Sequence, residues 1–215
     1  MICMRSSRKS PTRPTKNKKF SKRNGTPRKQ FFFSLEDDYF FYRKHTFFFA
    51  KECIKKIQHL SNVLEIGPEN DQSEYQQFNT SIISKFCADN NISYKSLDQD
   101  ETAKCNYTCS VEDLSLIKEK FDVVIMLEVL EHVQRLFEVP KQLCSIMNKG
   151  SLLCIHTPYL FKVHGPIPDC WRFSEYGYRA LFDSLFEIER LYTYPDNELG
   201  KNSFPLCIGA IMRKK

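Results

Sequence analysis

Short apolar runs alternate with amphipathic stretches over residues 62–212, and this alternation predicts strands and helices in turn. Helical spacing covers residues 74–90, 133–147 and 176–185, and a turn at 148–150 is expected to end the second of these helices. The order predicts a doubly wound, mostly parallel α/β sheet that ends in an antiparallel hairpin. The runs that predict strands are 62–67 (NVLEIG), 92–98 (ISYKSLD), 122–127 (DVVIML), 151–157 (SLLCIHT), 187–194 and 204–212.

An aromatic segment, residues 31–60, precedes this alternating region and is expected to be helical from about Leu35 onward. Its apolar residues recur at helical spacing, with Lys and Glu between them. Packing of this stripe against the sheet is the favoured interpretation, and a platform on which nucleic-acid bases stack is the alternative. The residues of the stripe are Tyr39, Tyr42, Phe49, Cys53, Ile57 and Leu60.

The first 30 residues carry 11 of the 32 Lys and Arg and no Asp or Glu. The remaining 21 basic residues face 26 acidic ones, so a basic tail precedes a mildly acidic body. Self-repulsion and the scarcity of apolar residues predict that residues 1–30 are disordered. We expect residues 5–29 to bind RNA or another polyanion, with 16–23 as a nuclear address; a merely solvating tail is the alternative.

Length and composition limit the protein class. With 215 residues and 41% hydrophobic content, one folded domain over residues 31–215 is expected. No apolar run approaches the roughly 20 residues of a membrane span, and no secretory signal is apparent. Nine cysteines without a CxxC pair argue against a disulfide scaffold and a structural zinc site. An intracellular location, cytoplasmic or nuclear, is therefore expected.

The ends of the predicted strands carry the candidate chemistry, because ligands of open α/β sheets bind at the carboxyl ends of the strands. Gly67 follows the first strand and allows a sharp turn, while Asp98 ends the second and is placed to bind a ribose diol. The GxGxxG pattern of dinucleotide binding is absent, which argues against an oxidoreductase that uses a nicotinamide cofactor. The pattern favours an adenosine-containing ligand that has no pyrophosphate.

Several of these segments together resemble class I S-adenosylmethionine-dependent methyltransferases, over residues 62 to about 190. The most specific is FDVVIMLEVLEHV, in which the pair Glu131-His132 follows the run 122–127, which corresponds to the fourth strand of the family; the pair is typical of the small-molecule and glycan-type group. The resemblance implies the Rossmann-like methyltransferase fold and S-adenosylmethionine as cofactor. The other matching segments are VLEIGPEND, SLDQD, NKGSLLCIHTP and the late H-x4-D-x2-R.

The resemblance also implies roles for individual residues. Glu65 and Gly67 would contact the methionine part of the cofactor, and Asp98 would bind the ribose hydroxyls. Ser110 and Val111 would lie beside the adenine, and Leu127 would line the pocket. Pro68-Glu69-Asn70 after a single glycine, and Ser110 where many members carry Asp, depart from the usual pattern.

An oxygen or nitrogen nucleophile that must lose a proton benefits from a general base. His164 is the first candidate and His132 the second; a loop-pinning bond from His164 to Asp169 and a structural role for His132 are the alternatives. No spacing of His and carboxylate residues matches a metal site, so no metal is expected.

The favoured function is methyl transfer to a small-molecule or macromolecular acceptor. The alternative is an inactive methyltransferase-like protein that binds nucleic acid or another polyanion through its tail.

Overall fold

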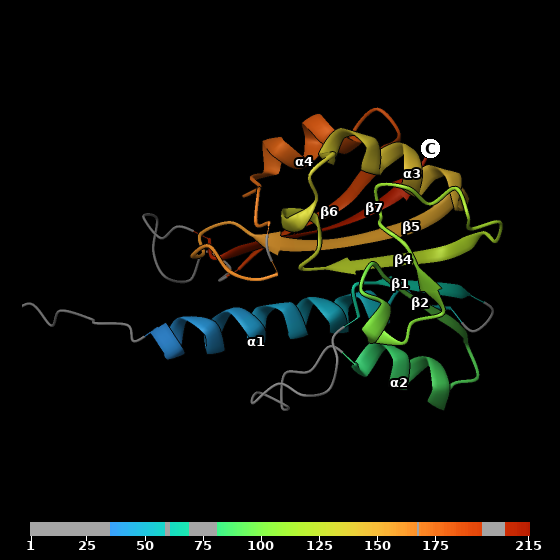
Figure 1. Ribbon diagram of the computed structural model, residues 1–215, viewed down its shortest axis with the longest axis horizontal. Helices are drawn as coiled ribbons and strands as arrows, with labels where there is room; N and C mark the ends of the chain where they lie inside the picture. Colours follow the sequence, from blue (N-terminus) through green and yellow to red (C-terminus); the bar gives the residue numbers. More distant parts are fainter. Residues whose placement is uncertain (1–34, 59–60, 69–80, 167, 195–204) are drawn as a thin grey trace, which may run out of the picture. The chain divides into compact units, whose positions relative to one another are not determined.

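The computed structural model describes residues 35–58, 61–68, 81–166, 168–194 and 205–215, and the predicted basic tail lies outside them. Seven strands form one sheet in the order β3-β2-β1-β4-β5-β7-β6 (Figure 1). The first five strands are parallel, and β7 is antiparallel to both β5 and β6. This confirms the mostly parallel sheet with its closing hairpin. The strands are β1 (Asn62–Ile66), β2 (Ser93–Asp98), β3 (Tyr107–Thr108), β4 (Phe121–Leu127), β5 (Met147–Pro158), β6 (Phe186–Tyr194) and β7 (Cys207–Lys214).

The strand order places a topological switch point between β1 and β4. The chain leaves β1 for β2 on one side and returns through β4 on the other. Because the connections then diverge to opposite sides, a crevice opens at the carboxyl ends of these two strands. The predicted ligand site falls at this place.

Helices cover both faces of the sheet (Figure 1). α1 (Leu35–Ile54) and α2 (Ile82–Asp89) lie on one face, and α3 (Val139–Ser145) and α4 (Glu175–Phe182) lie on the other. Each face has its own apolar core, with Phe49 and Ile83 in the first and Tyr178 and Phe182 in the second. All four side chains are fully buried.

The aromatic stripe of α1 packs against the sheet, as the favoured interpretation predicted. Phe49 and Cys53 are completely buried and share a core with strand residues such as Ile211. A Cβ on Gly209 of β7 would lie 2.6 Å from the Phe49 ring, so this glycine lets the ring approach the sheet. Packing excludes these two side chains from a base-stacking platform.

The prediction of one helix over residues 133–147 is mostly wrong. Two 3₁₀ turns, Leu130–His132 and Leu136–Glu138, precede a short α3. Glu112 explains the interruption, because its carboxylate accepts hydrogen bonds from the backbone N–H groups of Gln134 and Arg135 at 2.6 and 2.8 Å. Pro140 then falls in the first turn of α3, where its missing N–H is not needed.

Two other boundaries differ from the sequence prediction. β5 begins at Met147, so the turn predicted at 148–150 lies within the strand as an irregularity, with Gly150 at φ +86°. The helix predicted over 74–90 is described only as α2, and residues 74–80 lie outside the described part. Among the described helices, none has the length and apolar content that a membrane span requires.

Candidate functional site

A cavity of about 290 Å³ lies at the carboxyl ends of β1, β2 and β4, at the switch point of the sheet. The loop after β3 forms another wall, and Pro166 and Pro168 of the loop after β5 border it as well. Four of the predicted cofactor residues line this cavity, and His132 does too. Those four are Gly67, Asp98, Ser110 and Val111.

Gly67 occupies the turn after β1 in the left-handed region, at φ +67°. Its N–H donates to the carbonyl of Leu97 at 2.8 Å, which ties the turn to β2. A Cβ at this position would lie 2.4 Å from Cγ2 of Val129, a residue that also borders the cavity. Both the backbone conformation and the close neighbour therefore require glycine here.

Asp98 is the last residue of β2, and its half-buried carboxylate lies in the cavity wall. One oxygen, Oδ1, accepts a hydrogen bond from the Asp100 N–H at 2.9 Å. This bond fixes the orientation of the carboxylate and leaves acceptor capacity for a ligand hydroxyl, because a carboxylate has about four lone-pair sites.

Ser110 and Val111 follow the short strand β3 and form the wall beside Asp98. The turn here is closed by the Asp113 N–H, which donates to the Ser110 carbonyl at 3.0 Å. Glu112 lines the same wall and holds the segment of Gln134 and Arg135 against it. Glu112 was not among the predicted site residues, because nothing in its local sequence indicates a partner more than twenty residues away.

Glu65 and Leu127 are not among the cavity-lining residues. The Glu65 side chain is buried and accepts a hydrogen bond from the Tyr94 hydroxyl at 2.7 Å. Burial raises the pKa of Glu65 to about 7, while the bond from Tyr94 acts in the opposite direction. Leu127 is part of the core that α1 covers. Their side chains therefore face away from the cavity, whereas the ends of their strands border it.

The fold brings Glu131, His132 and His164 together beside the cavity. Oε1 of Glu131 lies 3.8 Å from Nε2 of His132 and 4.0 Å from Nε2 of His164. The two imidazole rings meet edge to face, with centroids 5.0 Å apart. The first two residues come from the turn after β4 and the third from the loop after β5. Sequence spacing gave no sign of this cluster, because only the tertiary structure brings His164 to the other two.

Burial dominates the electrostatics of this cluster. It raises the pKa of the Glu131 carboxyl well above its usual range, and nearby Glu128 and Asp169 raise it further. Burial also lowers the pKa of His164, although Asp169 opposes that shift. Burial thus favours the neutral His164 imidazole, which can accept a proton or donate a lone pair, and it favours the protonated Glu131 carboxyl when no cation lies beside it.

The loop after β5 is held in place by Asp169 and Arg172. Asp169 accepts two hydrogen bonds from the Arg172 guanidinium and further bonds from the backbone N–H and the imidazole Nδ1 of His164. Arg172 holds the pKa of Asp169 well below its usual range. Trp171 donates its indole N–H to the Val133 carbonyl at 2.6 Å. The predicted bond between His164 and Asp169 is therefore present in the structure.

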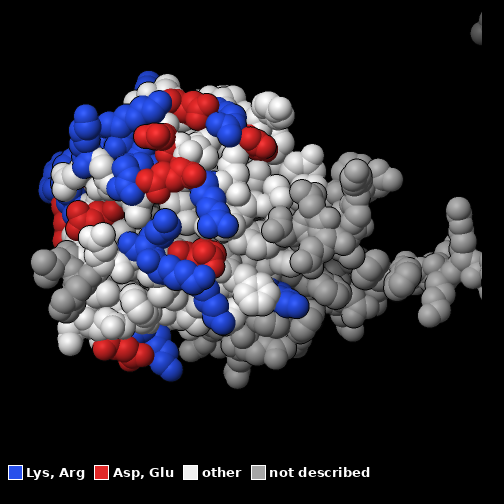
Figure 2. Space-filling model, turned by 180° about the vertical axis from the view of Figure 1, so that it is seen from behind, with Lys and Arg blue, Asp and Glu red and all other residues white. Residues whose placement is uncertain are grey.

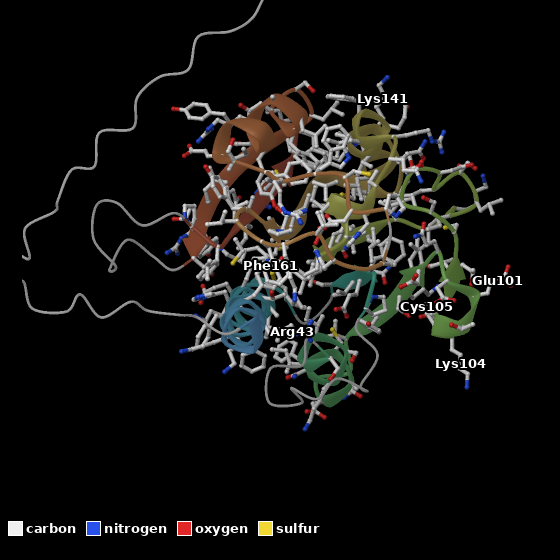
Figure 3. The ribbon with its side chains drawn as sticks, turned by 60° about the vertical axis from the view of Figure 1, so that its left-hand side comes forward. Arg43, Glu101, Lys104, Cys105, Lys141 and Phe161 are labelled. Carbon is white, nitrogen blue, oxygen red and sulfur yellow. The ribbon has the colours of Figure 1, made fainter. Side chains whose placement is uncertain are left out.

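Helix α1 packs against the same loop. The Tyr42 ring stacks on Phe161 with centroids 4.4 Å apart, and Figure 3 shows Phe161 beside α1 at Arg43. Phe161 in turn contacts the His164 ring edge to face at 5.2 Å. The N-terminal helix thus supports the position of His164 through one aromatic side chain.

Glu128 and His156 form a buried pair next to the cluster, which sequence analysis did not identify. His156 Nδ1 contacts Oε1 of Glu128, and the Thr46 hydroxyl donates to the same oxygen at 3.4 Å. Burial raises the pKa of Glu128 and lowers the pKa of His156 to about 3, so a neutral carboxyl–imidazole pair is favoured. Glu128 has φ +58°, a strained conformation for a residue with a side chain.

No protein-family model matches the sequence, and no curated protein matches it significantly. Solved structures do match. N-methyltransferase NodS from Bradyrhizobium japonicum is 14% identical, with 84% of this chain and 99% of NodS covered and a TM-score of 0.57. A SAM-dependent methyltransferase from Archaeoglobus fulgidus is 16% identical, with 80% and 94% covered and a TM-score of 0.53.

TehB from Haemophilus influenzae also matches, at 16% identity and a TM-score of 0.52. The match covers 77% of this chain but only 61% of TehB, so this chain spans less than two thirds of that protein. At such low identities the similarity establishes the fold and not the activity. The chain thus has the fold of S-adenosylmethionine-dependent methyltransferases, as the sequence predicted.

Proposed function

We propose that this protein is an S-adenosylmethionine-dependent methyltransferase that transfers a methyl group to an oxygen or nitrogen nucleophile. One observation carries the proposal: Gly67 follows β1, Asp98 ends the neighbouring strand β2, and both border the same cavity at the switch point. The glycine turn allows the protein backbone to approach the methionine part of the cofactor closely. The carboxylate one strand away is placed to bind the ribose hydroxyls. Together they match the shape and polarity of an adenosine that carries an amino-acid chain.

The remaining cofactor contacts follow from the walls of the cavity. Ser110 and Val111 would lie beside the adenine, with the hydroxyl as a polar contact. Glu65 and Leu127 would act through the strand ends that they form, because their side chains point away. NodS, which shares the fold, has been crystallised with S-adenosyl-L-homocysteine, the product of such a reaction. That complex supports the same class of ligand here.

Methyl transfer requires the nucleophile to be aligned with the methyl carbon of the sulfonium. Positioning alone supplies about 7–11 kcal/mol of the barrier in well-oriented reactions. An acceptor hydroxyl or protonated amine must also lose a proton. His164 and His132 are the proposed bases, and each has Nδ1 engaged, so Nε2 is the atom left to accept that proton.

Calorimetric titration with S-adenosylmethionine tests the cofactor site. Asp98→Asn should weaken binding by at least about tenfold, because hydrogen bonds to a charged group contribute about 1.5–3 kcal/mol. Asp183→Asn is the matched control, since Asp183 is an exposed residue at the end of α4, and it should leave affinity unchanged. Equal affinity of the wild type and Asp98→Asn would refute the proposed ribose contact.

The alternative is an inactive relative that binds RNA or another polyanion through residues 5–29. On the face in Figure 2, described Lys and Arg side chains lie beside Asp and Glu, so the body offers mixed charge there. We assign polyanion binding to the tail because residues 1–30 carry 11 Lys and Arg and no Asp or Glu. Binding of single-stranded RNA by the full chain should fall steeply as salt increases, since basic side chains release condensed counterions. Binding that is insensitive to salt would exclude this role.

A further inference from the structure

The Glu131, His132 and His164 cluster has the donor set of a metal site. One oxygen and two nitrogens, each a possible ligand atom, lie within 4.8 Å of one another. A transition-metal ion binds such atoms at about 2.0–2.2 Å, which places neighbouring ligands about 3–3.5 Å apart. The separations of 3.8 and 4.0 Å from Glu131 Oε1 are longer than this, and all three atoms lie within 4.8 Å of one another, so the side chains would move closer together around a bound ion.

Both imidazoles are oriented for coordination by their other nitrogen. His132 Nδ1 bonds the Pro168 carbonyl at 3.0 Å, and His164 Nδ1 bonds the Asp169 carboxylate at 3.0 Å. An Nδ1–H that donates to such an acceptor leaves a lone pair on Nε2. Metal-binding histidines almost always make this kind of outer contact. Asp169 is itself held by Arg172, so the orientation of His164 is doubly supported.

Glu131 supplies a second, independent observation. Its side chain has no solvent exposure, and neither carboxylate oxygen has a hydrogen-bond partner among the described residues. Oε2 of Glu128, three residues earlier, is likewise buried and unsatisfied. Buried polar atoms are normally satisfied, and a buried carboxylate is normally paired with a cation. The two imidazoles do not meet this need, because each lies beyond hydrogen-bond distance of Glu131.

We propose that Glu131, His132 and His164 bind a divalent transition-metal cation next to the cavity. The expected ion is Zn²⁺ or a similar metal rather than Mg²⁺, because imidazole suits zinc, iron and cobalt, whereas Mg²⁺ prefers oxygen ligands. Three protein ligands leave coordination positions open for an external ligand. This reverses the sequence-based expectation of no metal, which depended on spacing along the chain.

The existence of this site does not depend on the cofactor, but its role rests on the proposed function. His132 borders the cavity, so an acceptor oxygen can reach an open position of the cation. The cation would lower the pKa of a coordinated acceptor hydroxyl, which would lose its proton to water. The resulting alkoxide oxygen would then bond to the methyl carbon as the bond from that carbon to the sulfonium breaks and S-adenosylhomocysteine leaves. With the cation bound, the two Nε2 atoms act as ligands and no longer as bases.

Calorimetry on the untagged full chain tests the proposal, with Zn²⁺ and Mg²⁺ titrated separately. We expect one Zn²⁺ per chain and much weaker Mg²⁺ binding. Co²⁺ should give visible absorption bands without a sulfur-to-metal charge-transfer band. Absence of Zn²⁺ binding, a preference for Mg²⁺, or a thiolate band would each overturn the proposal. These metal titrations use only the wild-type protein, so a folding defect in a variant cannot affect their result.

Variants then identify the ligands. Glu131→Gln, His132→Gln and His164→Gln should each weaken Zn²⁺ binding by about 100-fold or more, and Asp169→Asn by about 10–100-fold. His45→Gln, a histidine on α1 that stacks on Tyr194, and Cys170→Ser, an exposed thiol beside Asp169, are the controls. Zn²⁺ binding that survives Glu131→Gln and His164→Gln, or that is lost in a control, would refute the site.

The same samples separate the two proposals. S-adenosylhomocysteine is titrated into the wild type and into Glu131→Gln, which lacks one of the proposed metal ligands. Retained Zn²⁺ binding without cofactor binding would refute the proposed function alone, whereas cofactor binding without Zn²⁺ binding would refute the metal site alone.

Discussion

Gly67 and Val129 are in contact across the switch point: a Cβ on Gly67 would lie 2.4 Å from Cγ2 of Val129. Gly67 directly follows β1 and Val129 lies just after β4, so the contact joins the ends of the two strands between which the cavity opens. Both residues line the cavity, and the absence of a side chain on Gly67 leaves room for the Val129 side chain beside the turn.

Gly67→Ala should lower the free energy of unfolding by about 2–4 kcal/mol, because it adds left-handed strain of about 1–2 kcal/mol and a steric clash. Gly150→Ala is the matched control. Gly150 is also left-handed, at φ +86°, but a Cβ there would have no atom within 4 Å, so only the strain should remain. Urea unfolding measures both.

The clash itself can be isolated by a double substitution. Val129→Ala removes Cγ2, so Gly67→Ala should be less destabilising in that background than in the wild type. Additive effects of the two substitutions would show that Val129 is not the neighbour that requires glycine.

Glu65 predicts a pH dependence of stability. Its pKa is raised from 4.5 to about 7 in the folded state, so the folded protein retains a proton that the unfolded chain releases. The stability that this group contributes is complete below about pH 4.5 and is lost as the pH rises to about 7. Glu65→Gln removes this pH dependence. The free energy of unfolding of the variant minus that of the wild type should therefore increase by up to about 3 kcal/mol between pH 4 and pH 8.

Urea unfolding of the wild type and Glu65→Gln at several pH values checks this prediction. Glu187→Gln is the control, because Glu187 is exposed on β6. A wild-type-to-variant difference that stays constant from pH 4 to pH 8 would contradict the raised pKa.

The ion pair of Asp169 and Arg172 is expected to hold the loop after β5 in a fixed conformation. Arg172→Lys loses the two-pronged contact of the guanidinium with the carboxylate, for which lysine has no substitute. The His164 N–H, which donates to Asp169 at 2.9 Å, should then exchange with solvent about tenfold faster or more. Arg179→Lys, in the exposed pair with Glu175 on α4, should leave this exchange rate unchanged.

Asp169 also gives this loop a pH dependence. Because its pKa is depressed in the folded state, its contribution to stability is present above the ordinary pKa of 3.8 and is lost only as the pH falls through the lower folded value. Arg172→Lys should move the loss to higher pH. Amide exchange at His164 that responds to pH identically in both proteins would contradict this assignment.

Sequence patterns predicted every strand of the sheet except β3, because each of the other strands has a strong local signature. The run Phe121–Leu127 is dense in β-branched and apolar residues, and six of its seven residues are buried. The interruption before α3 has no such signature. It depends on Glu112, which binds the N–H groups of Gln134 and Arg135 from a distant loop. β3 consists of only two residues, which is too short for any periodicity.

The candidate site likewise contains residues that the sequence predicted and residues that only the tertiary structure brings together. Gly67 and Asp98 were predicted from their positions at strand ends, and the topology then placed both in one cavity wall. Glu65 was assigned with them, but alternation along β1 sends its side chain to the opposite side, toward Tyr94. The cluster of Glu131 and His164 depends on the path of the loop after β5, which no local pattern specifies.

Calorimetric titration of the full chain with S-adenosylhomocysteine, and separately with NAD⁺, tests the central claim most directly. The proposed function predicts one S-adenosylhomocysteine per chain with micromolar affinity and no heat from NAD⁺. An absence of S-adenosylhomocysteine binding up to millimolar concentration would contradict it, as would tighter binding of NAD⁺.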